Sequence, residues 1–161
     1  MFDRILVPID GSKTSGKALV QAMALAKTTH GRIRLIHVVG DTLSALGGEA
    51  AMICSDEIYT AVTAAGNRVL ADAAVLVETE RIPVDTVLCE PSAARLSDEI
   101  EAAAKSWGAN LIVIGSHGRR GVHRLLLGSD AEQIMRVVSV PVLLVRDAAT
   151  PPCGEPSVGF L

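Results

Sequence analysis

A glycine-punctuated segment near the C-terminal end carries residue types that could bind phosphate. It has the spacing Gly-x2-Gly-x9-Gly-Ser, formed by Gly115, Gly118, Gly128 and Ser129. An apolar run at 111–114 precedes it and a helical pattern follows it. Glycine lets backbone N–H groups approach an anion without a Cβ in the way, and the start of the next helix adds unpaired donors and partial positive charge. The segment therefore predicts a phosphate-binding loop between a strand and a helix.

The spacing separates this segment from the two most familiar nucleotide loops. The chain contains no Gly-x-x-x-x-Gly-Lys-Ser/Thr sequence, and no Gly-x-Gly-x-x-Gly follows a strand. The usual NTPase and dinucleotide interpretations therefore lose their main support. One alternative stays open, in which the glycines form two structural turns and Ser129 caps the helix.

Basic residues gather inside the same segment, where phosphate charge would need compensation. The cluster consists of Arg119, Arg120, His123 and Arg124, and His117 beside it could also donate to phosphate. The alternative is a solvated loop without a ligand. A formal net charge of −3 gives the chain no overall field that would hold nucleic acid or an acidic membrane, so neither is expected as a partner.

Asp10 is the second candidate ligand-binding side chain. It follows an apolar strand pattern and Pro8, and its carboxylate could accept hydrogen bonds from sugar hydroxyls or adenine-side donors. Its alternative role is local, because Asp-Gly before Ser12 commonly forms an Asx turn.

The histidines and cysteines show no metal-binding or disulfide pattern. His37 lies in a buried strand pattern and is expected to be a hydrogen-bonded core residue. His30 and His123 lack ligand partners at a metal spacing. Cys54, Cys89 and Cys153 are odd in number and widely spaced, which favours a reducing cytoplasm over a disulfide framework. No protein-ligated metal and no catalytic group are expected.

Together with Ile-Leu-Val-Pro-Ile-Asp-Gly-Ser at 5–12 and Pro-Val-Leu-Leu-Val-Arg at 141–146, the glycine pattern resembles the ATP-binding branch of the universal stress protein family. The resemblance covers about residues 1–147. It implies binding of ATP, or of AMP or ADP, with Mg²⁺ carried by the phosphates. It also implies that Asp10 contacts the nucleoside, that the main chain at Val38 reads the adenine edge and that Pro8 packs near the base. The implied ribose and phosphate contacts are Gly115, Gly118, Gly128 and Ser129, with the backbone of Ile114 and Asp130 alongside. His117 and Arg119 are added as candidate phosphate contacts from their place in the basic loop.

Two positions depart from the family pattern. Asp130 stands where a small apolar or hydroxyl residue is usual, and Glu90 stands where glycine is common. A carboxylate at 130 would weaken phosphate binding by repulsion or help to coordinate magnesium, and the sequence leaves both outcomes open.

The apolar pattern predicts strands alternating with helices. Strands are expected at 4–9, 32–39, 82–88, 110–115 and 142–146, and helices at 13–29, 49–79, 91–105 and 129–138. Gly31 is expected to end the first helix, Gly66 could interrupt or kink the second, and Pro91 should begin the third. Such alternation predicts a three-layer α/β/α sandwich around a parallel sheet. The resemblance implies the strand order 3-2-1-4-5, as in adenine nucleotide alpha hydrolase-like folds.

Length and composition predict one domain. The chain has 161 residues, 49% of them hydrophobic but few aromatic, so its core should consist of Ala, Val, Leu and Ile. Residues 1–147 form the expected domain, and 148–161, rich in proline, form an expected mobile tail. There is no leader pattern and no apolar run of membrane-spanning length, which predicts a soluble cytoplasmic protein.

These features predict an ATP-binding, nucleotide-dependent stress-response regulator, with slow hydrolysis at most. The alternative is an adenylate-handling enzyme, such as an ATP pyrophosphatase or adenylyl transferase, but no Ser-Gly-Gly-x-Asp-Ser loop is present. A homodimer is also expected, because Val142, Leu143, Leu144 and Val145 form an apolar run on a predicted sheet edge. The alternative is that the tail covers this edge within one chain.

Overall fold

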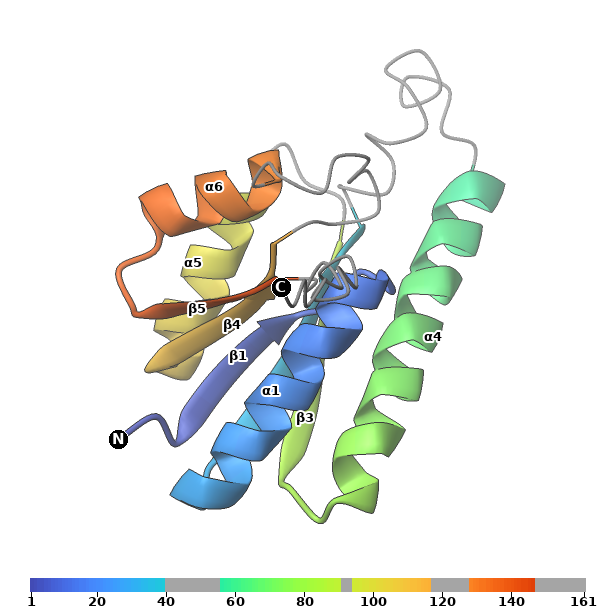
Figure 1. Cartoon of the computed structure of the whole chain (residues 1–161). Coiled ribbons are helices and arrows are strands. Elements are labelled where there is room, and N and C mark those ends of the chain that lie inside the picture. The colour runs from blue at the N-terminus through green and yellow to red at the C-terminus, as the bar shows by residue number, and fades with distance from the viewer. Residues whose placement is uncertain (40–55, 91–93, 117–127, 147–161) are drawn as a thin grey trace, which may run out of the picture.

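Strands and helices alternate along the chain as the apolar pattern predicts (Figure 1). The computed structural model describes residues 1–39, 56–90, 94–116 and 128–146, and the remaining residues lie outside the description. The described elements are β1 Arg4–Pro8, α1 Lys13–Thr29, β2 Arg32–Val38, α4 Asp56–Thr79, β3 Val84–Cys89, α5 Leu96–Trp107, β4 Leu111–Gly115, α6 Ser129–Val137 and β5 Val142–Val145.

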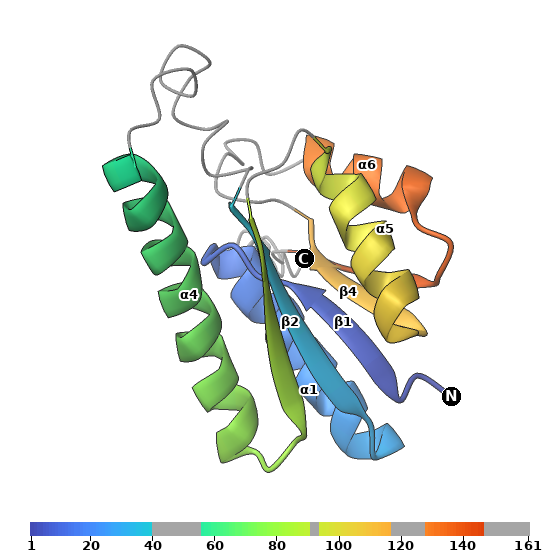
Figure 2. The same ribbon diagram turned by 180° about the vertical axis from the view of Figure 1, so that it is seen from behind.

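The strands form one parallel sheet in the order β3-β2-β1-β4-β5, which confirms the expected topology. β1 is central: Ile5 is paired with Ile33 on β2 and with Leu111 on β4. Helices α1 and α4 cover one face, and α5 and α6 cover the other (Figure 2). The protein is therefore the predicted three-layer α/β/α sandwich with four helices among the described residues.

Both faces of the central strand are buried, which explains its unbroken apolar sequence. Ile5 and Val7 point into the core under α1 and α4, whereas Leu6 between them points into the core under α5 and α6. All three side chains are fully buried. The aliphatic character expected from the composition is confirmed on both faces.

Trp107 closes the α5 face of the sheet near the amino ends of the strands. The guanidinium carbons of Arg4 and Arg34 lie 5.0 and 4.8 Å from the centroid of its ring, within cation–π range. Arg34 also forms an ion pair with Asp85, its partner in the β2–β3 register. As the single tryptophan of the chain and a buried one, Trp107 is a convenient fluorescent reporter of unfolding.

Two predicted helix ends and one possible helix interruption differ in the structure. The third helix does not begin at position 91, because residues 94 and 95 are not helical and α5 starts at Leu96. Gly31 is not the left-handed cap of α1: His30 takes that role with φ 52°, and an added Cβ at Gly31 would lie 2.8 Å from the backbone of Asp3. α4 runs through Gly66 without a break. Glycine at 31 and 66 reflects close packing, which sequence periodicity does not register.

Helix α4 is long and apolar enough to cross a membrane by length and composition, with a mean hydropathy of 1.2. The helix contains no unbroken apolar run, so the sequence pattern does not predict a membrane span here. Its apolar stripe packs on β2 and β3 through Leu70, Ala73 and Val77, as in a helix that covers a sheet. Val75 and Leu76 on the same helix are exposed, so apolar residues outside this stripe also raise the average.

Glu101 ties α5 to the segment between α6 and β5. Its carboxylate accepts a hydrogen bond from the Ser139 amide at 3.1 Å and forms an ion pair with Lys105 at 2.8 Å. The Lys105 ammonium, helped by the Ser139 amide, lowers the pKa of Glu101 against the opposing effect of desolvation. The charged form therefore stabilises the packing of α5 against the β5 side of the sheet.

Glu101→Gln is expected to lower the free energy of unfolding by about 1 kcal/mol at neutral pH. Because the folded-state pKa lies below the unfolded value, the carboxylate's contribution is complete above the unfolded pKa and is lost as pH falls through the folded pKa. The variant should therefore lose less stability than the parent on acidification. Urea denaturation followed by Trp107 fluorescence measures both effects. Glu132→Gln, which removes an exposed pair with Arg136 on α6, is the control, and identical acid profiles for Glu101→Gln and the parent would contradict the assignment.

Candidate functional site

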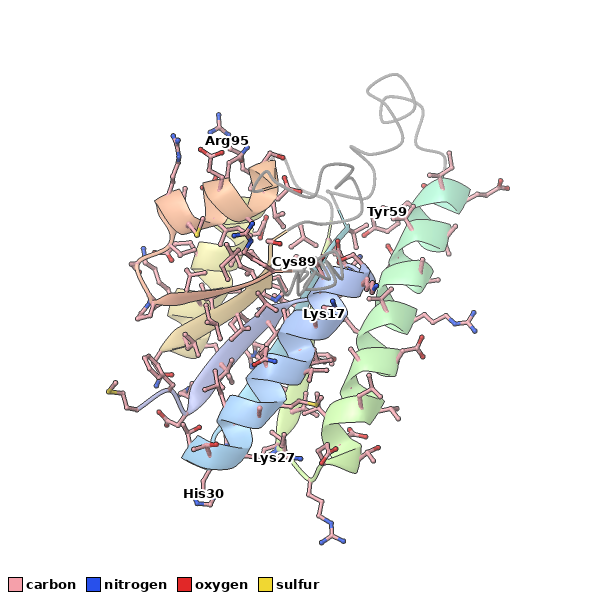
Figure 3. All side chains as sticks on the ribbon, in the orientation of Figure 1. Lys17, Lys27, His30, Tyr59, Cys89 and Arg95 are labelled. Carbon is pink, nitrogen blue, oxygen red and sulfur yellow. The ribbon has the colours of Figure 1, made fainter. Side chains whose placement is uncertain are left out.

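The predicted ligand residues of the described chain gather at the carboxyl ends of neighbouring strands. Pro8 ends β1, Val38 ends β2 and Gly115 ends β4. Because these three strands are adjacent and parallel, their carboxyl ends share one edge of the sheet. Figure 3 shows Lys17 and Cys89 toward this edge, and Lys27 and His30 toward the opposite one. His30 therefore lies away from the candidate site.

A tight turn follows β1 and leads into α1. The Asp10 carboxylate accepts a hydrogen bond from the Ser12 amide at 2.9 Å, and Gly11 adopts φ 80°. The Ser12 hydroxyl in turn accepts from the Ser15 amide at 3.2 Å and caps the helix. The predicted Ser12 helix cap is confirmed, and Asp10 also forms the Asx turn that was its alternative local role. This turn presents Asp10 at the carboxyl edge of β1, and its contact with a sugar stays a prediction.

Gly115 lies where β4 passes the first turn of α1. A Cβ at this position would lie 2.8 Å from the carbonyl carbon of Thr14 and 2.9 Å from its oxygen. Both atoms belong to backbone, so no side-chain rotation could make room. Sequence reasoning assigned Gly115 to ligand binding or to a structural turn and missed this packing role, because the role depends on an element a hundred residues earlier.

The two ends of the glycine segment meet at Ser116. The Ser116 amide donates to the carbonyl of Val145 on β5, and the Gly128 amide donates to the carbonyl of Ser116, each at 2.8 Å. Ser116 itself is buried. The start of α6 is thereby held beside the end of β4. His117, Gly118 and Arg119 of the predicted site, and the basic residues at 120, 123 and 124, lie outside the described residues.

Helix α6 begins without a side-chain cap. Its N-cap is Gly128, with φ −64° and ψ 145°, so the alternative in which Ser129 caps the helix is wrong. The Ser129 hydroxyl instead donates to the Asp130 carboxylate at 3.3 Å. With no side-chain oxygen at the cap, the first amides of α6 are suited to an anion. Asp130 and Glu132 in the first turn repel an anion electrostatically. These carboxylates would either weaken phosphate binding or help to coordinate magnesium.

The remaining predicted site residues of the described chain, Pro8, Val38 and Ile114, lie on strands. Pro8 is paired with Ile36 and Val38 with Cys89, and both are half-buried. Ile114 is buried with its side chain in the core under α5 and α6, so only its main chain could serve a ligand.

His37 is the hydrogen-bonded core histidine that the sequence predicts. It is 3% exposed, and its Nδ1 lies 2.6 Å from the carbonyl oxygen of Ile9. Cys89 at the end of β3 is half-buried. Burial, and to a lesser extent the nearby Glu99 carboxylate, raises the pKa of the Cys89 thiol, which disfavours a reactive thiolate. Within the described ranges, no group of three or more His, Cys, Asp and Glu side chains could hold a metal ion.

Fold and site together define a parallel α/β domain with Gly115 and Gly128 at the carboxyl edge of its sheet. The sequence profile of the universal stress protein family matches residues 1–146. Universal stress protein YxiE of Bacillus subtilis is 31% identical over 151 aligned residues, which cover 91% of this chain and 100% of the relative. The chain belongs to the universal stress protein family.

Solved structures agree with this fold. A universal stress protein family member from Burkholderia pseudomallei has a TM-score of 0.71 at 29% identity, covering 91% of this chain and 97% of that one. The universal stress protein of Archaeoglobus fulgidus in complex with dAMP has a TM-score of 0.65 at 20% identity, covering 91% of this chain and 100% of that one. At that lower identity the likeness concerns the fold alone.

Proposed function

We propose that this protein binds an adenine nucleotide, ATP or its products AMP and ADP, at the carboxyl ends of β1, β2 and β4. The observation that carries the proposal is the junction at Ser116, which brings Gly115 and the uncapped start of α6 to one place. The Asp10 turn stands at the end of the strand next to β4. The Archaeoglobus fulgidus protein of the same fold forms a complex with dAMP, which makes an adenine nucleotide the first ligand to test.

The proposed site has a nucleoside end and a phosphate end. At the nucleoside end, Asp10 contacts the sugar, Pro8 packs near the base and the main chain of Val38 reads the adenine edge. At the phosphate end, the amides at the start of α6 bind phosphate oxygens. The residues proposed for the ribose and phosphates are Ile114, Gly115, His117, Gly118, Arg119, Gly128, Ser129 and Asp130.

The carboxylates at the start of α6 favour binding of a nucleotide that carries Mg²⁺ on its phosphates over binding of a metal-free nucleotide. Asp130 and Glu132 would repel bare phosphates, whereas Mg²⁺ on the phosphates reverses the local sign. Mg²⁺ keeps most of its ligands from phosphate and water, so one carboxylate near it suffices. The donor set of the described residues thus fits Mg²⁺-nucleotide better than free nucleotide.

The proposed role is regulatory, in a cytoplasmic stress response, with ATP hydrolysis slow at most. Lys17 follows Gly11-x4-Gly16, but Ala18 stands where a Walker loop needs Ser or Thr, and residues 16–18 lie in helix α1, which favours this proposal over an adenylate-handling enzyme. A homodimer through β5 is part of the proposal. In the sheet order β5 is an edge strand, and Leu143 on it is 37% exposed.

Asp10→Ala is expected to weaken ATP and AMP equally, by about 1 to 3 kcal/mol, because the lost contact is to the nucleoside that both share. Asp10→Asn is the matched variant: it keeps an oxygen that can accept from the Ser12 amide and so preserves the turn, but lacks the charge. Isothermal titration of ATP, AMP and adenosine into each protein measures the effect. A folded parent protein that binds none of the three at millimolar concentration would overturn the proposed function.

A further inference from the structure

We infer that His37 is a positioning residue for the nucleoside end of the site, acting through the main chain of Ile9 and Val38. The inference rests on the proposed function and deepens it. The His37 ring is buried in the core and is not itself a proposed ligand contact. It hydrogen-bonds to Ile9, the residue before Asp10, and Val38 follows His37 on β2. Its ring joins the end of β1 to β2 and α4.

Ile9 is held at both of its main-chain polar groups. Its amide donates to the Ile36 carbonyl at 2.8 Å, and its carbonyl oxygen lies 2.6 Å from Nδ1 of His37. The last ladder pair between β1 and β2 is Pro8 with Ile36, so the ring extends the connection of the two strands past the end of the ladder. A carbonyl can only accept, which assigns the proton to Nδ1.

The carbonyl of Ile9 belongs to the same peptide unit as the amide of Asp10. In a planar trans peptide these two groups point in opposite directions. A bond from His37 to the carbonyl therefore also sets the direction of the Asp10 amide and the start of the turn that presents its carboxylate. On β2, Val38 follows His37 directly, so the anchored ring constrains two of the proposed nucleoside contacts, Asp10 and Val38.

Helix α4 fixes the ring from the other side. A Cβ at Gly66 would lie 2.7 Å from Cδ2 and 3.2 Å from Nε2 of His37, and 2.8 Å from Cδ1 of Leu88. Glycine at 66 thus lets the helix backbone pack directly against the imidazole. The ring is confined between the Ile9 carbonyl on one side and the backbone of α4 on the other.

His37→Leu and His37→Asn form the decisive pair. Asparagine places an amide nitrogen at the position of Nδ1 and can still donate to Ile9, whereas leucine fills space without a donor. His37→Leu is expected to weaken adenosine, AMP and ATP by about the same factor, roughly tenfold, and His37→Asn by clearly less. Equal losses in the two variants, or a loss confined to ATP, would overturn the inference.

A readout without nucleotide separates this inference from the proposed function. Amide hydrogen exchange at Asp10 and Gly11 should accelerate in His37→Leu and stay near the parent rate in His37→Asn, with urea denaturation confirming that both variants are folded. Unchanged exchange in folded His37→Leu contradicts the positioning role whether or not nucleotide binds. If the parent fails to bind nucleotide while exchange behaves as expected, the proposed function fails and the structural coupling stands.

Discussion

Gly115→Val is expected to lower the free energy of unfolding by about 3 kcal/mol or more. The new side chain would begin 2.8 Å from the backbone of Thr14 in the first turn of α1, so either β4 or the whole helix must shift. The core between them is closely packed and resists such a shift. Urea denaturation followed by Trp107 fluorescence measures the loss.

Gly16→Ala is the matched control for this effect. Gly16 lies in the same first turns of α1, but a Cβ there meets nothing within 4 Å. Alanine should stabilise the helix by about 0.5 to 1 kcal/mol. A lower free energy of unfolding in Gly115→Val together with a higher one in Gly16→Ala would establish close packing as the cause. A Gly115→Val protein as stable as the parent would show that α1 can yield, and the glycine would then be explained by the ligand alone.

If the proposed homodimer forms through β5, Leu143→Lys is expected to raise its dissociation constant at least about 100-fold, because pairing of two β5 edges would bury an unpaired ammonium. Leu143 is the suitable position, because Val142 and Leu144 pack on the core under α5 and α6 and Val145 on the opposite core. A charge at those three positions would also disturb the monomer. Sedimentation equilibrium over a concentration series measures the constant.

Val20→Lys adds the same charge at an exposed apolar position on α1 and should leave the dimer unchanged. Truncation after Asp147 distinguishes the alternative in which the tail covers the edge. Removal of the tail leaves the mass unchanged if β5 pairs with a second copy, and creates new association if the tail had covered the strand. A full-length chain that stays monomeric at high micromolar concentration would refute pairing through β5.

Sequence patterns predicted the alternation of elements well, because apolar periodicity is a local property of each element. Strands that are buried on both faces, such as β1, give continuous apolar runs. The boundaries were less certain where packing decides them. α5 begins at Leu96 rather than at Pro91, and the left-handed residue at the end of α1 is His30 although glycine follows it. Glycine at 31 is needed for the approach of Asp3, which no local rule can reveal.

The sequence by itself determined the family and the parallel α/β class and predicted the segments of the candidate site, because residue types at fixed spacings carry these. Only the tertiary structure decided why glycine stands at 115 and 66, where the backbone of α1 and the ring of His37 occupy the space of a Cβ. It also decided that the two ends of the glycine segment meet at Ser116 and that His37 reaches Ile9. These contacts join residues far apart in the chain, and parallel strand order is what brings them together.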